Sequence, residues 1–316
     1  MDRNLTLIVE GNAFLLASDG DTVNTEELQS LHSTQEETDT RVVLYCMHAL
    51  EKGYKFAVVR SPDTDILFIL LHYATKLQPL VVLFDTGKGN NRRLINVTAL
   101  AADLTHRYCE AILGLHCFTG EDANCAFKGK GKVGPLKILT RKQKYMDTFI
   151  KLGTDWELDQ QTMDELEEFT CSMYGFRNSN SVDRVRSTML KKMTDGNSLN
   201  MTMVKKVDMS KLPPCRRSLT MHILRVNYRI CQWKRSHLPS PHIPPPGREN
   251  GWCQGEGFLE PLWSDGPVLP QSLLDVVQTV TPPAANTDDS SVDSDDDDVV
   301  SMAGSCYSSS SDSDID

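Results

Sequence analysis

Carboxylate side chains recur in three short motifs in the first part of this 316-residue chain. The motif EETD lies where a helix is predicted to begin, SPDTD follows an apolar strand, and GED lies in a glycine-rich loop. Clustered carboxylates are the ligands that hard divalent ions prefer, and two such ions can activate a water for phosphodiester hydrolysis. The motifs therefore predict one metal-binding group drawn from Glu36, Glu37, Asp39, Asp63, Asp65, Glu121 and Asp122.

The same acids have a purely structural alternative. Acidic residues in the first turn of a helix favour the helix dipole, and Asp63 has the residue type of an N-cap. Helical periodicity places Glu36 and Asp39 on one face, together with Val43. A structural cluster without any metal therefore stays open, and so does the choice between Glu36 and Glu37.

A basic, glycine-rich segment follows the third acidic motif. Residues 123–146 hold seven Lys or Arg and no acid. Glycine-rich turns expose backbone N–H groups to phosphate, and nearby lysines add charge, so this segment predicts contact with a nucleic-acid backbone. The predicted contact residues are Lys128, Gly129, Lys130, Gly131, Lys132 and Lys137.

Alternating strand and helix patterns must position these motifs. Apolar strands are predicted near residues 55–60 and 80–85, and helices near 33–53, 63–77, 97–105 and 108–117. Residues 5–18 predict a hairpin, and Ser33 with Glu36 predicts a capping box for the first helix. Continuous apolar strands that alternate with helices predict an α/β fold with a mostly parallel sheet, covered by helices on both faces.

The composition changes along the rest of the chain. We expect an α/β domain over residues 1–150, with a basic helix–hairpin–helix-like segment at 119–150, and a helical extension over 151–236. Residues 237–280 are expected to form a Pro-rich strap, with a small hairpin near 252–263. The extension's last helix carries Arg225, Arg229, Lys234 and Arg235, which are expected to be surface charges or a further nucleic-acid face.

The formal net charge of −10 arises from the C-terminal tail. Of 43 acidic residues, ten are aspartates between Asp288 and Asp316, so the preceding residues balance 33 acids with 33 basic side chains. The Ser/Asp-rich segment 281–316 is expected to be disordered and to compete with nucleic acid for the basic segment. Five serines have Asp three residues later, a pattern resembling sites for acidophilic casein-kinase-II-type kinases: Ser290, Ser294, Ser309, Ser311 and Ser313.

Cysteine usage and hydropathy bear on the compartment. The nine cysteines form no CxxC pair, which is typical of a reducing environment. No stretch approaches the ~20 apolar residues of a membrane span, and the N-terminus lacks the pattern of a signal peptide. We therefore expect a protein of the nucleus or cytoplasm that is neither secreted nor bound to a membrane.

The order of the motifs resembles the PIN-like 5′-nuclease superfamily of flap endonucleases and XPG-type enzymes. The resemblance covers roughly residues 30–145, through EETDT, SPDTDIL and TGEDANCAFKGKGKVGPLKIL. It implies a metal-dependent hydrolase of DNA or RNA that uses Mg²⁺ or Mn²⁺, with Gly129-Lys130-Gly131 as the hairpin turn on the DNA backbone. The implied catalytic and metal-binding residues are Glu37, Asp39, Asp63, Asp65 and Asp122.

A second resemblance covers more of the chain. QEETDTR, RSPDTDIL, LPPCRRSLTMHILRVNYRICQWKR and IPPPGRENGWCQGEGFLEPLW are similar to a group of uncharacterised, transposon-associated animal proteins. The nuclease superfamily carries a first strand with an aspartate ahead of these motifs, and the acids ahead of them in this chain include Asp2, Glu10 and Asp19, none of which follows a strand that leads into a crossover helix. The alternative to a nuclease is therefore a non-catalytic nucleic-acid or protein interaction module derived from a transposon protein.

Overall fold

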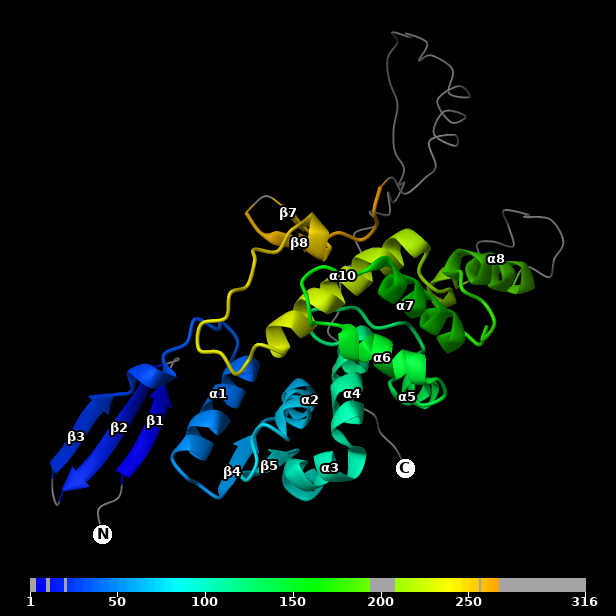
Figure 1. Cartoon of the computed structure of the whole chain (residues 1–316). Coiled ribbons are helices and arrows are strands. Elements are labelled where there is room, and N and C mark those ends of the chain that lie inside the picture. The colour runs from blue at the N-terminus through cyan, green and yellow to red at the C-terminus, as the bar shows by residue number, and fades with distance from the viewer. Residues whose placement is uncertain (1–3, 10–11, 20–21, 194–207, 256, 267–316) are drawn as a thin grey trace, which may run out of the picture.

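The computed structural model of the chain describes residues 4–9, 12–19, 22–193, 208–255 and 257–266, with backbone alone for residues 4–26 and 30. These residues form a mixed α/β structure of helices and three small sheets, which confirms the predicted class at that level (Figure 1). The predicted acidic tail, 281–316, lies outside the described residues. In the described part of the chain, no helix combines the length and apolarity that crossing a bilayer requires.

An antiparallel sheet at the N-terminus lies at one end of the molecule, beside α1 (Figure 1). It consists of β1 (Asn4–Val9), β2 (Asn12–Asp19) and β3 (Thr22–Glu27). Leu7 pairs with Phe14 in the first hairpin, so the predicted hairpin is confirmed. The third strand was not predicted, because its polar residues lack the alternation that marks a strand.

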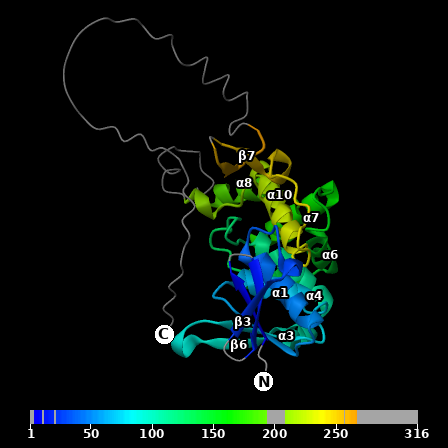
Figure 2. The same ribbon diagram turned by 90° about the vertical axis from the view of Figure 1, so that its left-hand side faces the viewer.

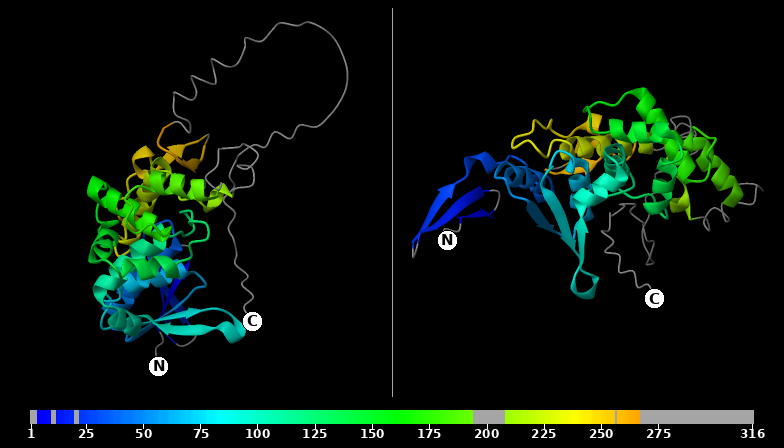
Figure 3. Two further views of the ribbon diagram at one scale, coloured as in Figure 1. Left: turned by 90° about the vertical axis from the view of Figure 1, so that its right-hand side faces the viewer. Right: turned by 60° about the horizontal axis from the view of Figure 1, so that its bottom comes forward.

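The central sheet is smaller and less parallel than predicted. Its strands are β4 (Phe56–Arg60), β5 (Val81–Thr86) and β6 (Arg93–Asn96), in the order β4-β5-β6. β4 and β5 are parallel, whereas β5 and β6 are antiparallel and form a hairpin that projects from the body (Figure 3). The connection between β5 and β6 is short, and a parallel pair needs a crossover of a dozen or more residues. Gly87, at φ +81°, begins the turn that reverses the chain instead.

Four helices pack around this sheet: α1 (Thr38–Glu51), α2 (Thr64–Tyr73), α3 (Val97–Leu104) and α4 (His106–Phe118). Val82 and Phe84 of β5 are buried in the core that these helices share with the sheet. The predicted cover on both faces is not present among the described residues. Phe56, Val58 and Leu94 alternate to the opposite face and are 66%, 61% and 60% exposed.

The helical extension shares its core with the α/β part. Its helices include α7 (Gln160–Met173), α8 (Val182–Met193) and α10 (Arg216–Trp233), and α5 (Val133–Leu139) and α6 (Gln143–Lys151) precede it. The ring of Phe118 on α4 contacts Phe149 on α6 and Phe169 on α7. One hydrophobic cluster runs from Val43 to Trp233, so the predicted division at residue 150 does not separate two cores.

The α10 helix lies at the centre of the molecule rather than on its surface (Figures 1 and 2). It packs against α4 and α7, and Trp233 is fully buried. Arg225 and Arg229 are only 3% and 9% exposed, so the expectation that they are surface charges is wrong. Each lies three or four residues from apolar side chains on the same helix face, and packing of that face carries the arginines inward.

The Pro-rich strap crosses the molecule and contacts the segment before α1. It ends in the predicted hairpin, formed by β7 (Trp252–Gln254) and β8 (Leu259–Pro261). Ser33 Oγ donates to Pro239 O at 2.9 Å, and Gln35 Nε2 donates to Leu238 O at 2.6 Å. The predicted capping box at Ser33 is therefore wrong. The helix begins at Thr38, because residues 33–35 are bound to the strap.

Candidate active site

Two helix starts supply four of the predicted ligands. Asp63 is the N-cap of α2, and its side chain accepts from Asp65 N at 2.8 Å. This cap holds Asp63 and Asp65 at the carboxyl end of β4, where ligand sites in open α/β sheets lie. Glu37 is the N-cap of α1 but makes no side-chain cap hydrogen bond, which leaves its carboxylate available to a distant partner. Asp39 lies in the first turn of α1.

The predicted carboxylates influence one another electrostatically. Burial, followed by the charges of Asp63 and Glu37, raises the pKa of Asp39 to about 6, and Asp65 adds to the effect. Burial, Asp65 and Asp122 raise the pKa of Asp63. We call the five predicted residues Glu37, Asp39, Asp63, Asp65 and Asp122, which are linked by these influences, the carboxylate cluster. Glu37, the residue that the motif spacing selects, is one of the groups that raise the pKa of Asp39.

Asp39 is expected to make stability and metal binding respond to pH in opposite senses. Its pKa is raised from 3.8 to about 6, so the stabilisation from its proton is complete below about pH 4 and is lost as pH rises through about 6. A divalent ion needs the ionised carboxylate, so Mn²⁺ affinity should rise over the same interval. Thermal unfolding between about pH 4.5 and 7.5, with and without Mn²⁺, measures both. The Asp39→Asn variant should lose both responses, and an unchanged pH profile would contradict this assignment.

Asp65 has a histidine partner that sequence reasoning did not identify. Asp65 is 5% exposed, and His116 Nε2 on α4 donates to its Oδ1 at 2.6 Å. The His116 ring stacks on Phe68 with 3.9 Å between the ring centroids, and burial, the largest influence, lowers its pKa, which favours the neutral imidazole. His116 Nδ1 has no hydrogen-bond partner among the described residues. A neutral, stacked His116 fixes the orientation of the Asp65 carboxylate.

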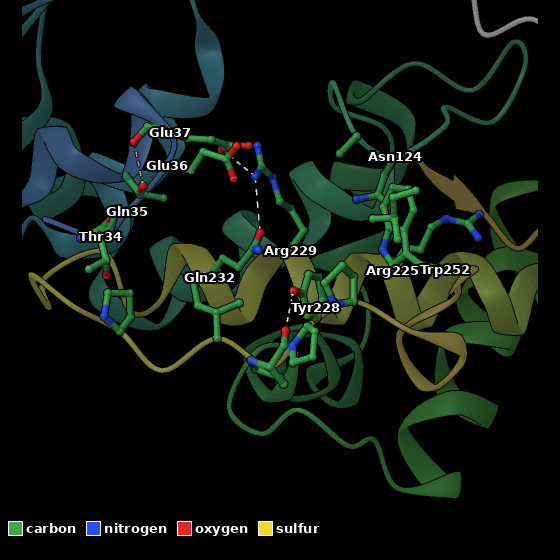
Figure 4. Close-up of a pocket in the computed structure, with 18 residues that line it drawn as sticks. Thr34, Gln35, Glu36, Glu37, Asn124, Arg225, Tyr228, Arg229, Gln232 and Trp252 are labelled. Carbon is green, nitrogen blue, oxygen red and sulfur yellow. Dashed lines mark hydrogen bonds and ion pairs between the residues drawn. The ribbon is translucent and has the colours of Figure 1, made fainter. Parts of the chain in front are cut away.

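Arg229 is the second residue that sequence reasoning missed. Its guanidinium lies 2.6 Å from Glu37 Oε2 (Figure 4). It also lies 3.7 Å from Glu121 Oε2, and the Glu121 side chain has no exposed area. Burial raises the pKa of Glu121, and Arg229 is among the groups that lower it. The sequence contained a signal for this role. Val226 and Trp233 flank Arg229 at helical spacing, which places the arginine on a buried face.

The cluster has the donor chemistry of a hard-cation site but is not arranged as one. Among the described residues, no group of three or more Asp, Glu, His or Cys side chains lies at metal-binding spacing. The cation Arg229 and the hydrogen-bond donor His116 instead hold Glu37 and Asp65. Binding of a divalent ion would therefore require side-chain rotation, with the five cluster carboxylates as ligands.

The basic segment lies directly after the cluster's last acid. Gly129 has φ +71°, and a Cβ atom added to it would meet no atom within 4 Å, so this residue forms an open left-handed turn. Lys128 pairs with Asp208 at 3.4 Å, and Lys130 Nζ lies 4.5 Å from the Tyr174 ring centroid. Gly131 and Lys137 are exposed. These residues form an exposed basic turn suited to a phosphate backbone.

Lys132 has a structural role within this segment. Its Nζ donates to His116 O at 3.0 Å and to Gly120 O at 2.6 Å. These bonds satisfy carbonyls at the C-terminal end of α4, where a cation is also favoured by the helix dipole. Lys132 therefore ties the basic turn to the end of α4, next to the cluster, and its charge is already used there.

Comparison with models of known protein families, with curated proteins and with solved structures finds no match for this chain.

Proposed function

We propose that this chain is a PIN/flap-endonuclease-like protein that hydrolyses phosphodiester bonds of DNA or RNA with Mg²⁺ or Mn²⁺, or a degenerate relative of such an enzyme. The carrying observation is the placement of carboxylates at the starts of α1 and α2, where burial and then the charges of Asp63 and Glu37 raise the pKa of Asp39, and burial with Asp65 and Asp122 raises the pKa of Asp63. Like charges held together disfavour folding unless a cation compensates them. The resemblance of the motif order to the nuclease superfamily supports the same interpretation.

The residues present suit a hard divalent ion. Five carboxylates come from α1, the start of α2 and the loop after α4, and oxygen ligands of this kind hold Mg²⁺ or Mn²⁺. A bound ion supplies an activated water and stabilises the leaving oxygen of the phosphodiester. Asp39, with its pKa near 6, can exchange a proton at neutral pH. His116 holds Asp65 in one orientation through the bond at 2.6 Å.

The basic turn supplies the substrate contact in this proposal. Lys128 and Lys137 are exposed, and Lys128 pairs with the exposed Asp208, whereas Lys130 lies over the ring of the buried Tyr174. Lys132 connects the turn to α4, which also carries His116. A nucleic-acid backbone bound on the turn would therefore lie next to the cluster.

Replacing Lys128, Lys130 and Lys137 together by Gln is expected to weaken binding of single-stranded DNA by about 10- to 100-fold at low salt. Three phosphate contacts contribute about 0.7 each to the salt slope for single strands, so the slope should fall by about two units. Fluorescence anisotropy in EDTA at several salt concentrations measures both quantities. Lys191→Gln, Lys192→Gln and Lys211→Gln together form a control with the same charge change, and equal losses in both variants would contradict the proposed contact.

A specific observation favours the non-catalytic alternative. Arg229 is a built-in cation for Glu37 and Glu121, and the described residues contain no preformed metal-ligand group. A chain that has replaced its metal by an arginine would keep the basic turn and bind nucleic acid or protein without cleaving it. Metal affinity after removal of this arginine distinguishes the two functions.

Replacing Arg229 by Gln is expected to raise Mn²⁺ affinity by about 10-fold if the cluster is a metal site. A tenfold gain corresponds to about 1.4 kcal/mol, which lies between the repulsion of about 1 kcal/mol in bulk water and about 4 kcal/mol at an effective dielectric of about 20 for two unit charges roughly 4 Å apart. Calorimetric titration with Mn²⁺ checks this. Arg235→Gln is the matched control, because Arg235 donates to main-chain carbonyls of Gly153 and Cys231. Absence of Mn²⁺ binding in both variants and the parent would favour the non-catalytic module.

The proposed setting is the nucleus or cytoplasm. All eight described cysteines are free thiols, and five of them are buried as small apolar side chains. Free thiols of this kind are typical of proteins in a reducing compartment. A kinase acting on the serines of the tail belongs to the same proposal.

A further inference from the structure

A pocket of about 440 Å³ lies beside the carboxylate cluster, between α10, the strap and the start of α1 (Figure 4). Figure 4 shows Glu37 and Gln35 on one side of it and Asn124 and Trp252 on the other. Glu37 belongs to both the pocket wall and the cluster, because it also raises the pKa of Asp39. Pockets of roughly 300–1,000 Å³ are large enough to enclose a small planar group.

Flat apolar surfaces make up much of the wall. The strap contributes Ile243 and the three prolines 244–246, and α10 contributes Tyr228. Tyr228 is buried, and its hydroxyl donates to Pro244 O at 2.8 Å, which holds the proline wall against α10. Trp252 faces the pocket from β7. Aromatic surfaces of this kind stack nucleobases of any sequence.

Three residues of the wall each keep a buried polar atom without a hydrogen-bond partner among the described residues. Two are acceptors, Gln35 Oε1 and Asn124 Oδ1, and one is a donor, Trp252 Nε1. Gln35 and Asn124 are 6% and 3% exposed. A buried polar atom of this kind destabilises the protein unless a water or a ligand pairs with it. A planar ligand that carries both hydrogen-bond donors and acceptors could pair with these atoms.

The charged residues that line the pocket argue against phosphate as its ligand. Arg229 is paired with Glu37, and Arg225 donates to the carbonyls of Gly251 and Leu262. Glu36 and Glu37 at the wall would also repel an anion. The pocket therefore suits the base of a nucleotide, while the phosphate belongs at the cluster and the basic turn.

We infer that this pocket binds one unpaired nucleobase of a single strand whose neighbouring phosphate lies at the carboxylate cluster. The position of the phosphate rests on the proposed function, whereas the binding of the base does not. A base that is stacked and paired in a duplex would not enter, so the pocket takes only bases of unpaired strands. Glu37, at the boundary of pocket and cluster, sets the distance between the base and the phosphate.

The test is binding in EDTA, where no metal-dependent cleavage takes place. The probes are a twelve-nucleotide thymidine strand and an abasic strand of equal length and charge, each with a fluorescent label. The parent protein should prefer the thymidine strand by about 10-fold, since one stacked base contributes about 1–3 kcal/mol. Ile243→Trp fills the pocket without removing a polar group, and should abolish that preference while leaving abasic-strand affinity unchanged.

Leu94→Trp, on the exposed face of the central sheet, is the control and should keep the preference. If the parent shows no preference, or if Ile243→Trp keeps it, the inference is overturned and the pocket fits a segment of protein instead. The outcome is independent of catalysis. Loss of the preference in Ile243→Trp supports the base pocket even if the protein cleaves nothing, and cleavage with an unchanged preference supports only the nuclease.

Discussion

Replacing Asp63 and Asp65 together by Asn is expected to lower Mn²⁺-dependent cleavage of labelled single-stranded, hairpin and flap substrates by at least about 100-fold. Loss of partners outside the ligand shell already costs about 10- to 100-fold in comparable sites, and these two residues are proposed ligands themselves. Both changes are nearly isosteric. Asn caps helices about as well as Asp, so the bond to Asp65 N that begins α2 should persist.

The asparagine at position 65 can also accept from His116, so the fold should be retained. Thermal unfolding of the double variant checks this, and Asp103→Asn on the exposed side of α3 is the control for a lost carboxylate. Cleavage that persists in the double variant would rule out the cluster as the catalytic group. Parent protein that binds Mn²⁺ but leaves all three substrates intact would favour the degenerate relative over the enzyme.

Replacing Phe118 by Ala is expected to lower the free energy of unfolding by about 3–5 kcal/mol, the usual cost of emptying a buried aromatic site. Phe118 is fully buried at the end of α4, and its ring lies 5.3 Å from Phe127 and 5.5 Å from Phe149, centroid to centroid. His222 on α10 contacts the same ring at 5.3 Å. The cavity would therefore open where four elements meet, and the surrounding rings cannot all move to fill it.

Urea unfolding followed by circular dichroism measures this change. Phe118→Leu should cost less, because a branched aliphatic side chain fills part of the volume. Phe56→Ala, at an exposed position of β4, should change stability by less than about 0.5 kcal/mol. Equal losses for Phe118 and Phe56 would show that the shared core of α4, α6, α7 and α10 does not hold the molecule together.

Local structure was predictable where the apolar periodicity agrees with the residues that begin and end a helix. The helix that begins at Asp63 and the helix that ends at Phe118 follow from apolar periodicity with an N-cap aspartate and a glycine after the end. The Gly87 turn was also predictable. A short glycine turn joins antiparallel strands, so this turn already excluded a parallel β5–β6 pair, against the expectation of a mostly parallel sheet.

The candidate site was predictable in part. Asp63 and Asp65 follow a strand, and sites gather at the carboxyl ends of strands, so their position needed no tertiary information. The start of α1 was less predictable. Ser33 has the residue type of a cap, but its hydroxyl bonds to Pro239, 206 positions later in the chain. Local patterns contain no information on such a partner.

The order of the acidic motifs, most of the strands and helices that carry them, and the basic turn after them could be predicted from the amino-acid sequence. These depend on interactions between residues near in the chain, such as caps, turns and periodic apolar faces. Only the tertiary structure decided which groups compensate the acids. Arg229 and His116 lie 192 and 51 positions from Glu37 and Asp65. Packing of α10 and α4 brings them inward, and a buried charge then takes whichever partner lies within reach.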